Sequence, residues 1–170
     1  MSTNRFGQEL KEYNYTKEEL AKFNYAKFTT KNGEILIKLF NQETPNTVAN
    51  FATLVNDDFY NGLNFHRVIA GFMAQGGCPD GTGAGGPSWA IKCEVDAPKQ
   101  VHKRGSLSMA HAGRDTGGSQ FFICFVPCPH LDKNHTVFGE IVENSENSFK
   151  TLDAIKQGDK IISIEILEKI

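Results

Sequence analysis

The chain has 170 residues, of which 39% are hydrophobic and 22% charged, and its formal net charge is -2. These values are typical of one globular domain with a hydrophobic core, and they exclude a disordered chain. The sequence has no long basic run, and phosphate binding needs clustered Lys and Arg, so nucleic acid is not expected as a partner.

The sequence shows neither a secretory signal nor a membrane segment. Its most apolar run, residues 34–40, is short and interrupted by Lys38, whereas a spanning helix needs about 20 apolar residues. We therefore expect a cytoplasmic protein with no membrane partner. In that reducing compartment the four cysteines are expected to be free thiols: Cys78, Cys93, Cys124 and Cys128.

Residues 1–22 have the pattern of an N-terminal extension, followed by one domain over residues 23–170. Thr16 and Glu19 form a capping-box pattern that predicts a short polar helix over residues 17–23. So short a helix is marginal alone and must dock or fray. The extension carries no recognisable chemistry.

A β-hairpin and a helix follow. Residues 25–30 and 34–40 are strand-like runs, and Asn32-Gly33 between them is a strong hairpin signal. Thr44 and Pro45 then suit the start of a helix whose apolar side chains recur at helical spacing: Val48, Phe51, Ala52, Leu54 and Val55.

Residues 65–77 combine an alternating strand pattern with unusual polar groups. Arg67 lies on the alternating part, and Phe72, Met73 and Gln75 follow a glycine bend. Alternation places every second side chain on one face, so a guanidinium, apolar side chains and an amide can converge there.

The next loop, residues 78–87, contains four glycines in the run Gly-Thr-Gly-Ala-Gly-Gly. A phosphate-binding loop would need a helix after it, but Pro87 and Ser88 follow without helical periodicity. The alternative is that glycine lets the backbone pass close to a ligand or a neighbouring strand.

The second half of the chain continues the β pattern. Further strands are predicted over residues 105–110, 119–125, 134–142 and 160–167, with a second core helix from Ser148, as its cap, to Gln157. Two helices among many short strands favour a mainly β fold built as a closed barrel, because closure removes exposed strand edges.

Two common catalytic arrangements fit poorly. Ser119 has no obvious base beside it, as a serine hydrolase would require. His130 and His135 with Asp132 have no regular ligand spacing, so no metal is expected.

The remaining polar and apolar groups suit a reaction that needs neither a nucleophile nor a cofactor. Rotation about an X-Pro bond has a barrier of about 18–20 kcal/mol that comes from amide resonance. In the twisted transition state the prolyl nitrogen gains a lone pair. A guanidinium aimed at that nitrogen binds the twisted state better than the planar one, which is the requirement for catalysis.

Four blocks of sequence carry a resemblance to a known family. Phe65-His66-Arg67-Val68-Ile69 through Gln75-Gly76-Gly77, together with Leu107–Gly113, Gly118–Ile123 and His135–Gly139, resembles the cyclophilin signature. The resemblance covers about residues 25–170, and the compact glycine-rich loop is similar to the bacterial type. It implies a closed eight-stranded antiparallel β-barrel capped by two α-helices. It also implies peptidyl-prolyl cis-trans isomerase activity on proline-containing peptides and unfolded or exposed segments, without a cofactor.

The same resemblance implies roles for individual residues. Arg67 matches the catalytic arginine, with Gln75, Phe72 and His135 beside it. The matching substrate-binding positions are Met73, Ala110, His111, Ala112, Gln120, Phe122, His130 and Leu131.

Two positions depart from the family pattern. His130 stands where the members most sensitive to cyclosporin carry tryptophan, and imidazole offers less apolar area. We therefore expect catalysis to be retained and cyclosporin affinity to be weakened. His111 replaces a common asparagine, which matters only if that position acts through its side chain.

Three hypotheses for function remain. The first is an isomerase that assists protein folding, the second is a module that captures proline segments without turnover, and the third is a scaffold role through residues 1–22. The presence of Arg67 favours the first, since binding alone does not need it. A monomer is expected.

Overall fold

The computed structural model describes residues 2–170, and eight antiparallel strands form its centre. Their order in the sheet is β3-β4-β6-β5-β7-β2-β1-β8. The strands are β1 (Tyr25–Thr30), β2 (Gly33–Leu39), β3 (Arg67–Ile69), β4 (Met73–Gly76), β5 (Ser106–Met109), β6 (Phe121–Cys124), β7 (Val137–Ile141) and β8 (Ser163–Leu167).

The expected closed barrel is replaced by a curled half-barrel, because no ladder of the described strands joins β3 to β8. The chain just before each edge strand spans the gap instead. The Gly62 N–H donates to the Ile161 carbonyl over 2.8 Å, and Asn64 and Lys160 form an isolated antiparallel bridge. β3 has only three residues, and the pairing across this gap continues through irregular backbone instead of a ladder.

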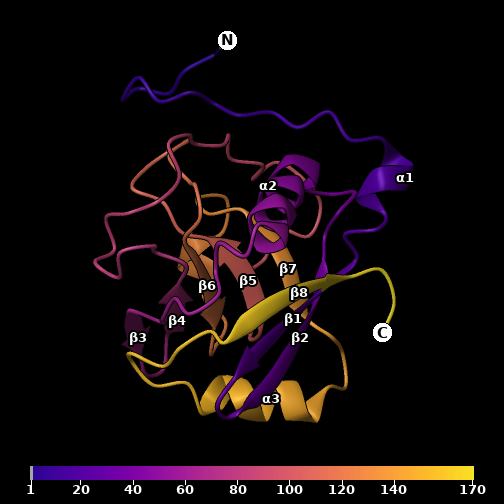
Figure 1. Ribbon diagram of the computed structural model, residues 1–170, viewed down its shortest axis with the longest axis vertical. Coiled ribbons are helices and arrows are strands. Elements are labelled where there is room, and N and C mark those ends of the chain that lie inside the picture. Colours follow the sequence, from indigo (N-terminus) through magenta and orange to yellow (C-terminus); the bar gives the residue numbers. More distant parts are fainter. Residues whose placement is uncertain (1) are drawn as a thin grey trace.

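Two helices cover opposite ends of the curled sheet, as Figure 1 shows. α2 (Pro45–Asn56) buries eight of its side chains, in agreement with the predicted helical spacing. α3 (Glu146–Asp153) lies against β2, where the Leu36 N–H donates to the Ser148 hydroxyl over 2.9 Å. The helix begins after Ser145, which occupies the N-cap position, and Ser148 lies within it. This corrects the predicted start at Ser148.

Aromatic rings fill the space between the sheet and α2. Phe51 of α2 stands 5.3 Å from both Tyr60 and Phe138 between ring centroids, and 6.0 Å from Phe121. All four side chains are at most 1% exposed. Such tilted and edge-to-face contacts add to the gain from burying these rings. They pack the strands of the site against α2.

The N-terminal segment docks on the domain. Thr16 caps the four-residue α1 (Lys17–Leu20) by accepting from the Glu19 N–H, as the capping box predicts. The segment crosses the end of the molecule beyond α2 (Figure 1). The Tyr13 hydroxyl donates to Asn50 of α2 over 2.9 Å. Within residues 2–170, no helix is long and apolar enough to cross a membrane.

Candidate active site

A chain of three side chains crosses neighbouring strands at the open side of the half-barrel. Arg67 on β3 is paired in register with Gln75 on β4, and its Nη1 donates to Gln75 Oε1 over 3.2 Å. Gln75 Nε2 in turn donates to Gln120 Oε1 over 3.0 Å. An exposed guanidinium with five N–H donors is thus held by one of them, so the others remain available to a ligand.

The glycine-rich loop holds Gln120, the last of these three side chains. Gln120 Nε2 donates to the carbonyls of Gly83 and Gly85, over 2.8 and 2.9 Å. The loop therefore presents acceptors to a neighbouring side chain, which is the alternative role expected from its glycines and not that of a phosphate cradle. With both Gln120 N–H groups used, its amide is fixed and orients Gln75, and through it Arg67.

An apolar cluster lies on the strands next to the arginine–amide chain. Met73 and Phe122, on the paired strands β4 and β6, are 1% and 4% exposed. Phe72, Ala110 and Leu131 pack against them as partly buried neighbours, and Leu131 comes from the 3₁₀-helix η1 (Pro129–Leu131).

Two histidines border this apolar cluster. His135 meets the Phe122 ring edge-to-face at 5.4 Å, and the His130 ring is 5.6 Å from Phe72. His135 Nδ1 bonds to the Met109 carbonyl over 2.8 Å. Burial lowers the pKa of His135 to about 4, so near pH 7 the ring is neutral and Nδ1 carries the proton.

The rim beyond His135 is formed by the segment from Ala110 to Ala112. The His111 ring stacks on His135 at 4.0 Å, and its Nε2 donates to the Asn134 carbonyl over 2.7 Å. His111 Nδ1 accepts from the Gly113 N–H over 3.1 Å. Both ring nitrogens are thus engaged within the loop, so this position offers a ligand mainly its backbone and ring face.

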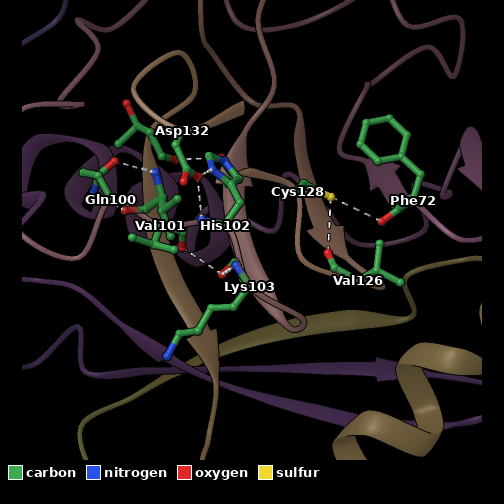
Figure 2. A network of polar contacts seen from close by, with 12 residues as sticks. Phe72, Gln100, Val101, His102, Lys103, Val126, Cys128 and Asp132 are labelled. Carbon is green, nitrogen blue, oxygen red and sulfur yellow. Dashed lines mark hydrogen bonds and ion pairs between the residues drawn. The ribbon is translucent and has the colours of Figure 1, made fainter. Parts of the chain in front are cut away.

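A buried histidine, to which no sequence pattern gave a role, packs against the apolar cluster. His102, 1% exposed, stacks on Phe122 at 5.9 Å, and its two ring nitrogens each lie 2.8 Å from a partner, Asp132 Oδ1 and Ser108 Oγ. Figure 2 shows His102 beside Asp132. No local pattern pointed to His102, because both partners lie on other segments of the chain.

This Ser108–His102–Asp132 arrangement has the contacts of a hydrolase triad, but it cannot meet a substrate carbonyl. Ser108 is fully buried, and its hydroxyl is also 3.1 Å from the Thr136 carbonyl. A nucleophile must be accessible, so the network supports Phe122 from below. Ser119, considered earlier as a nucleophile, is buried and donates to the Gly77 carbonyl over 2.8 Å.

The histidines considered for metal binding point to separate partners. His135 bonds to Met109, and Asp132 is taken by His102. Among residues 2–170, no three His, Cys, Asp or Glu side chains gather as a metal site would require. The four cysteines are free, as predicted, and burial raises the pKa of Cys124 and Cys128. Cys128 Sγ instead donates to the Val126 carbonyl (Figure 2).

Comparison with known proteins places this geometry in a family. Residues 25–168 match the model of the cyclophilin type peptidyl-prolyl cis-trans isomerases. A peptidyl-prolyl cis-trans isomerase of Helicobacter pylori strain J99 is 61% identical over 155 residues, which cover 91% of this chain and 94% of the relative. Peptidyl-prolyl cis-trans isomerase B of Bacillus subtilis is 57% identical over 113 residues, 66% of this chain and 79% of the relative.

Solved structures agree with this relationship. A cyclophilin type isomerase of Cryptosporidium parvum superposes with a TM-score of 0.72 at 32% identity, covering 86% of this chain and 95% of its own. The same protein was crystallised in the presence of the dipeptide Ala-Pro, and that structure superposes with a TM-score of 0.70 at 33% identity. With its fold, its arginine–amide chain and these matches, the chain belongs to the cyclophilin type peptidyl-prolyl cis-trans isomerases.

Proposed function

We propose that Arg67 is the catalytic donor of this isomerase and that the neighbouring apolar pocket holds the substrate proline. The observation that carries the proposal is the chain from Arg67 through Gln75 to Gln120, which fixes a guanidinium beside buried Met73 and Phe122. A donor held in advance of the reaction needs no reorganisation when charge develops in the transition state.

In this mechanism the pyrrolidine ring rests on Phe122 and Met73, with Phe72 and Leu131 as side walls. The prolyl nitrogen then faces Arg67, whose remaining N–H groups donate to its lone pair as the amide twists. Neutral His135 closes the pocket without adding a charge.

The flanking peptide is assigned to the rim. Ala110, His111 and Ala112 contact its backbone, and His130 borders the proline side beside Phe72. The Cryptosporidium parvum relative crystallised with Ala-Pro supports a proline-containing ligand for this chain, and unfolded or exposed protein segments are the matching natural substrates.

The test is isomerisation of a proline peptide by wild type, Arg67→Ala and Arg67→Lys, followed by NMR exchange. We expect Arg67→Ala to lower kcat/KM by about 100-fold or more while peptide binding persists, because removing one preorganised donor has an effect of this size. Arg67→Lys should restore only part of the rate, since an ammonium cannot reproduce the fork that contacts both Gln75 and the substrate.

Arg104→Ala is the matched control, because Arg104 pairs with Asp153 away from these residues. Unchanged turnover in Arg67→Ala would remove the mechanism. Binding by the wild type without acceleration over the uncatalysed tens to hundreds of seconds would favour a proline-binding module.

His130 carries a separate proposal, that this protein binds cyclosporin with weakened affinity. His130→Trp enlarges the apolar surface next to Phe72, so the variant should bind cyclosporin about tenfold more tightly than the wild type, while turnover changes little. Calorimetric titration of both proteins decides the point, and equal dissociation constants would refute it.

The remaining expectations are proposed on the same basis. The isomerase domain comprises residues 23–170 and residues 1–22 are an extension added to it. The protein acts as a monomer in the cytoplasm, where it assists folding.

A further inference from the structure

The N-terminal segment forms a defined turn beside the candidate site. The Asn4 N–H donates to the Gln8 carbonyl over 2.9 Å, and Asn4 Oδ1 accepts from the Phe6 and Gln8 N–H groups over 2.9 and 3.0 Å. Asn4 Nδ2 anchors the turn to the domain by donating to the Asp115 carbonyl over 3.0 Å. The Asn4 side chain therefore both closes the turn and attaches it to the domain.

Backbone pairing holds the segment after the turn. Leu10 is 8% exposed and forms a parallel bridge with Ala90, whose N–H donates to the Glu9 carbonyl over 2.8 Å. Trp89, next to this bridge, donates from Nε1 to Asn50 of α2 over 2.9 Å. The position of the turn relative to the site is thus determined by contacts on both sides.

A groove of about 490 Å³ lies between this turn and the site. Its lining includes Gln75, Gln120 and the rim from Ala110 to Ala112, which belong to the candidate site, together with Gln8 and Trp89. Ala110 also packs against the cluster of Met73 and Phe122, so the groove and that cluster share the rim.

The extension places hydrogen-bond donors and positive charge at the groove. Gln8 Oε1 accepts from Asn4 Nδ2 over 2.9 Å, which leaves the Nε2 donors without an acceptor among residues 2–170. Arg5 Nη2 donates to the Ala112 carbonyl over 3.1 Å, so its guanidinium lies at the rim. Lys11 stands 3.9 Å above the Trp89 ring.

Two carboxylates near the groove already accept hydrogen bonds from the chain. Asp80, beside the groove residue Gly85, accepts from the Thr82 N–H and hydroxyl over 3.1 and 2.7 Å. Asp115 Oδ1 accepts from the Cys93 N–H over 2.8 Å. Donors and cations on the extension side therefore match an occupant that brings acceptors and negative charge.

We propose that Gln8 and Arg5 determine specificity by receiving an acidic side chain of the substrate, a few residues from its proline. This inference rests on the proposed function, because it assigns the proline to the pocket over Phe122. It gives the N-terminal turn a role in substrate selection that the residues of the core site do not supply.

The experiment measures kcat/KM for proline peptides in which Ala, Gln, Glu and Lys are scanned through the three positions on each side of the proline. At one position Glu should be preferred over Lys. Gln8→Ala should lower kcat/KM for the Glu and Gln peptides by about two- to tenfold and leave the Ala peptide unchanged, as expected for one lost hydrogen bond. Arg5→Ala should affect only the Glu peptide.

The isosteric change Gln8→Glu provides the sharpest variant. It keeps an oxygen for Asn4 and replaces the Nε2 donors with a carboxylate oxygen, so Lys should become preferred over Glu. A purely structural role of Gln8 would not reverse a substrate preference. Gln42→Ala and Lys22→Ala, both at exposed positions away from the groove, are the matched controls.

Two results are distinguished by this design. If the Gln8 and Arg5 variants keep the wild-type order of preference and turn over the Ala peptide normally, the inference is wrong and the proposed function stands. If the wild type accelerates none of the peptides, the proposed function fails, and the inference fails with it.

Discussion

At the scale of single residues, the site depends on neutral hydrogen-bonding groups placed around one permanent charge. Gln75 and Gln120 have no titrating group, and His135 is neutral near pH 7 because burial depresses its pKa. Arginine stays charged throughout the physiological range. In the proposed mechanism, turnover therefore needs no proton to be gained or lost.

The depressed pKa of His135 has a consequence for stability. His135 titrates near pH 4 in the folded state and near pH 6.5 in the unfolded chain. Between these pH values the unfolded state therefore binds more protons at this residue. Stability supported by the neutral ring is present above pH 6.5 and is lost as the pH falls towards 4.

We predict that His135→Gln makes unfolding less sensitive to acid. Between pH 7 and pH 5 the variant should lose about 1 kcal/mol less unfolding free energy than the wild type, a value reduced for the partial exposure of the ring. Urea unfolding at both pH values measures it. An identical loss in both proteins would show that the pKa of His135 is the same in the folded and the unfolded chain.

Several residues of the candidate site could be picked out from the sequence, and others could not. Arg67, Phe72, Met73 and Gln75 fall in one short segment, so alternation and one glycine bend were enough to bring them together. Their roles were taken from a family resemblance and remain proposals.

Other participants had no local signal. His102 and Gln8 meet the site through contacts with segments far away in the sequence, and neither stands in a recognisable motif. Only the folded arrangement reveals that one supports Phe122 and that the other lines a groove.

At the scale of elements, local patterns predicted the hairpin of β1 and β2 and the helix α2 well. The turn lies one residue before the Asn32-Gly33 signal, at Lys31 and Asn32, because Gly33 already pairs with Thr30. The apolar residues of α2 recur at one face. The start of α3 was misplaced because the Ser148 hydroxyl, taken as a cap, instead accepts from the Leu36 N–H of β2, while the helix already begins at Glu146 after Ser145.

Gly77 lies where three segments of the chain pack closely together. Gly77, at the end of β4, has a φ of +88°, and a Cβ there would lie 2.7 Å from the Ser119 carbonyl oxygen and 3.0 Å from the Phe121 and Tyr60 rings. Tyr60 also donates to that same carbonyl over 2.8 Å. Neither backbone nor buried rings can move far in a packed interior.

We predict that Gly77→Ala lowers the free energy of unfolding by about 3 kcal/mol, from backbone strain and overpacking together. Gly62→Ala is the matched control, because Gly62 has a φ of +81° with open space around it. It should lose only about 1 kcal/mol. Equal losses in urea unfolding of the two variants would mean that the close approach at Gly77 relaxes freely.

At the scale of the whole molecule, the sequence predicted a mainly β fold but not its open edge. Strand count and alternation are local properties, whereas closure depends on whether β3 and β8 meet. Here β3 has only three residues, and the segments before β3 and β8 supply irregular hydrogen bonds across the gap. No pattern within either strand encodes that outcome.

The docking of the N-terminal segment was also beyond local patterns. The capping box marked α1, but the contacts of Asn4, Leu10 and Tyr13 with distant parts of the chain carry no signal of their own. The segment therefore looked like an appendage until the fold showed it beside the groove.

The role proposed for Arg67, stabilising the twisted amide, sets a limit on what this enzyme can do to its substrates. A group that stabilises only the twisted amide accelerates the forward and the reverse rotation equally, and it consumes nothing in doing so. The equilibrium ratio of cis to trans in a substrate chain is therefore set by that chain alone. The enzyme changes only the rate, so it affects chains whose folding is limited by a prolyl isomerisation that takes tens of seconds.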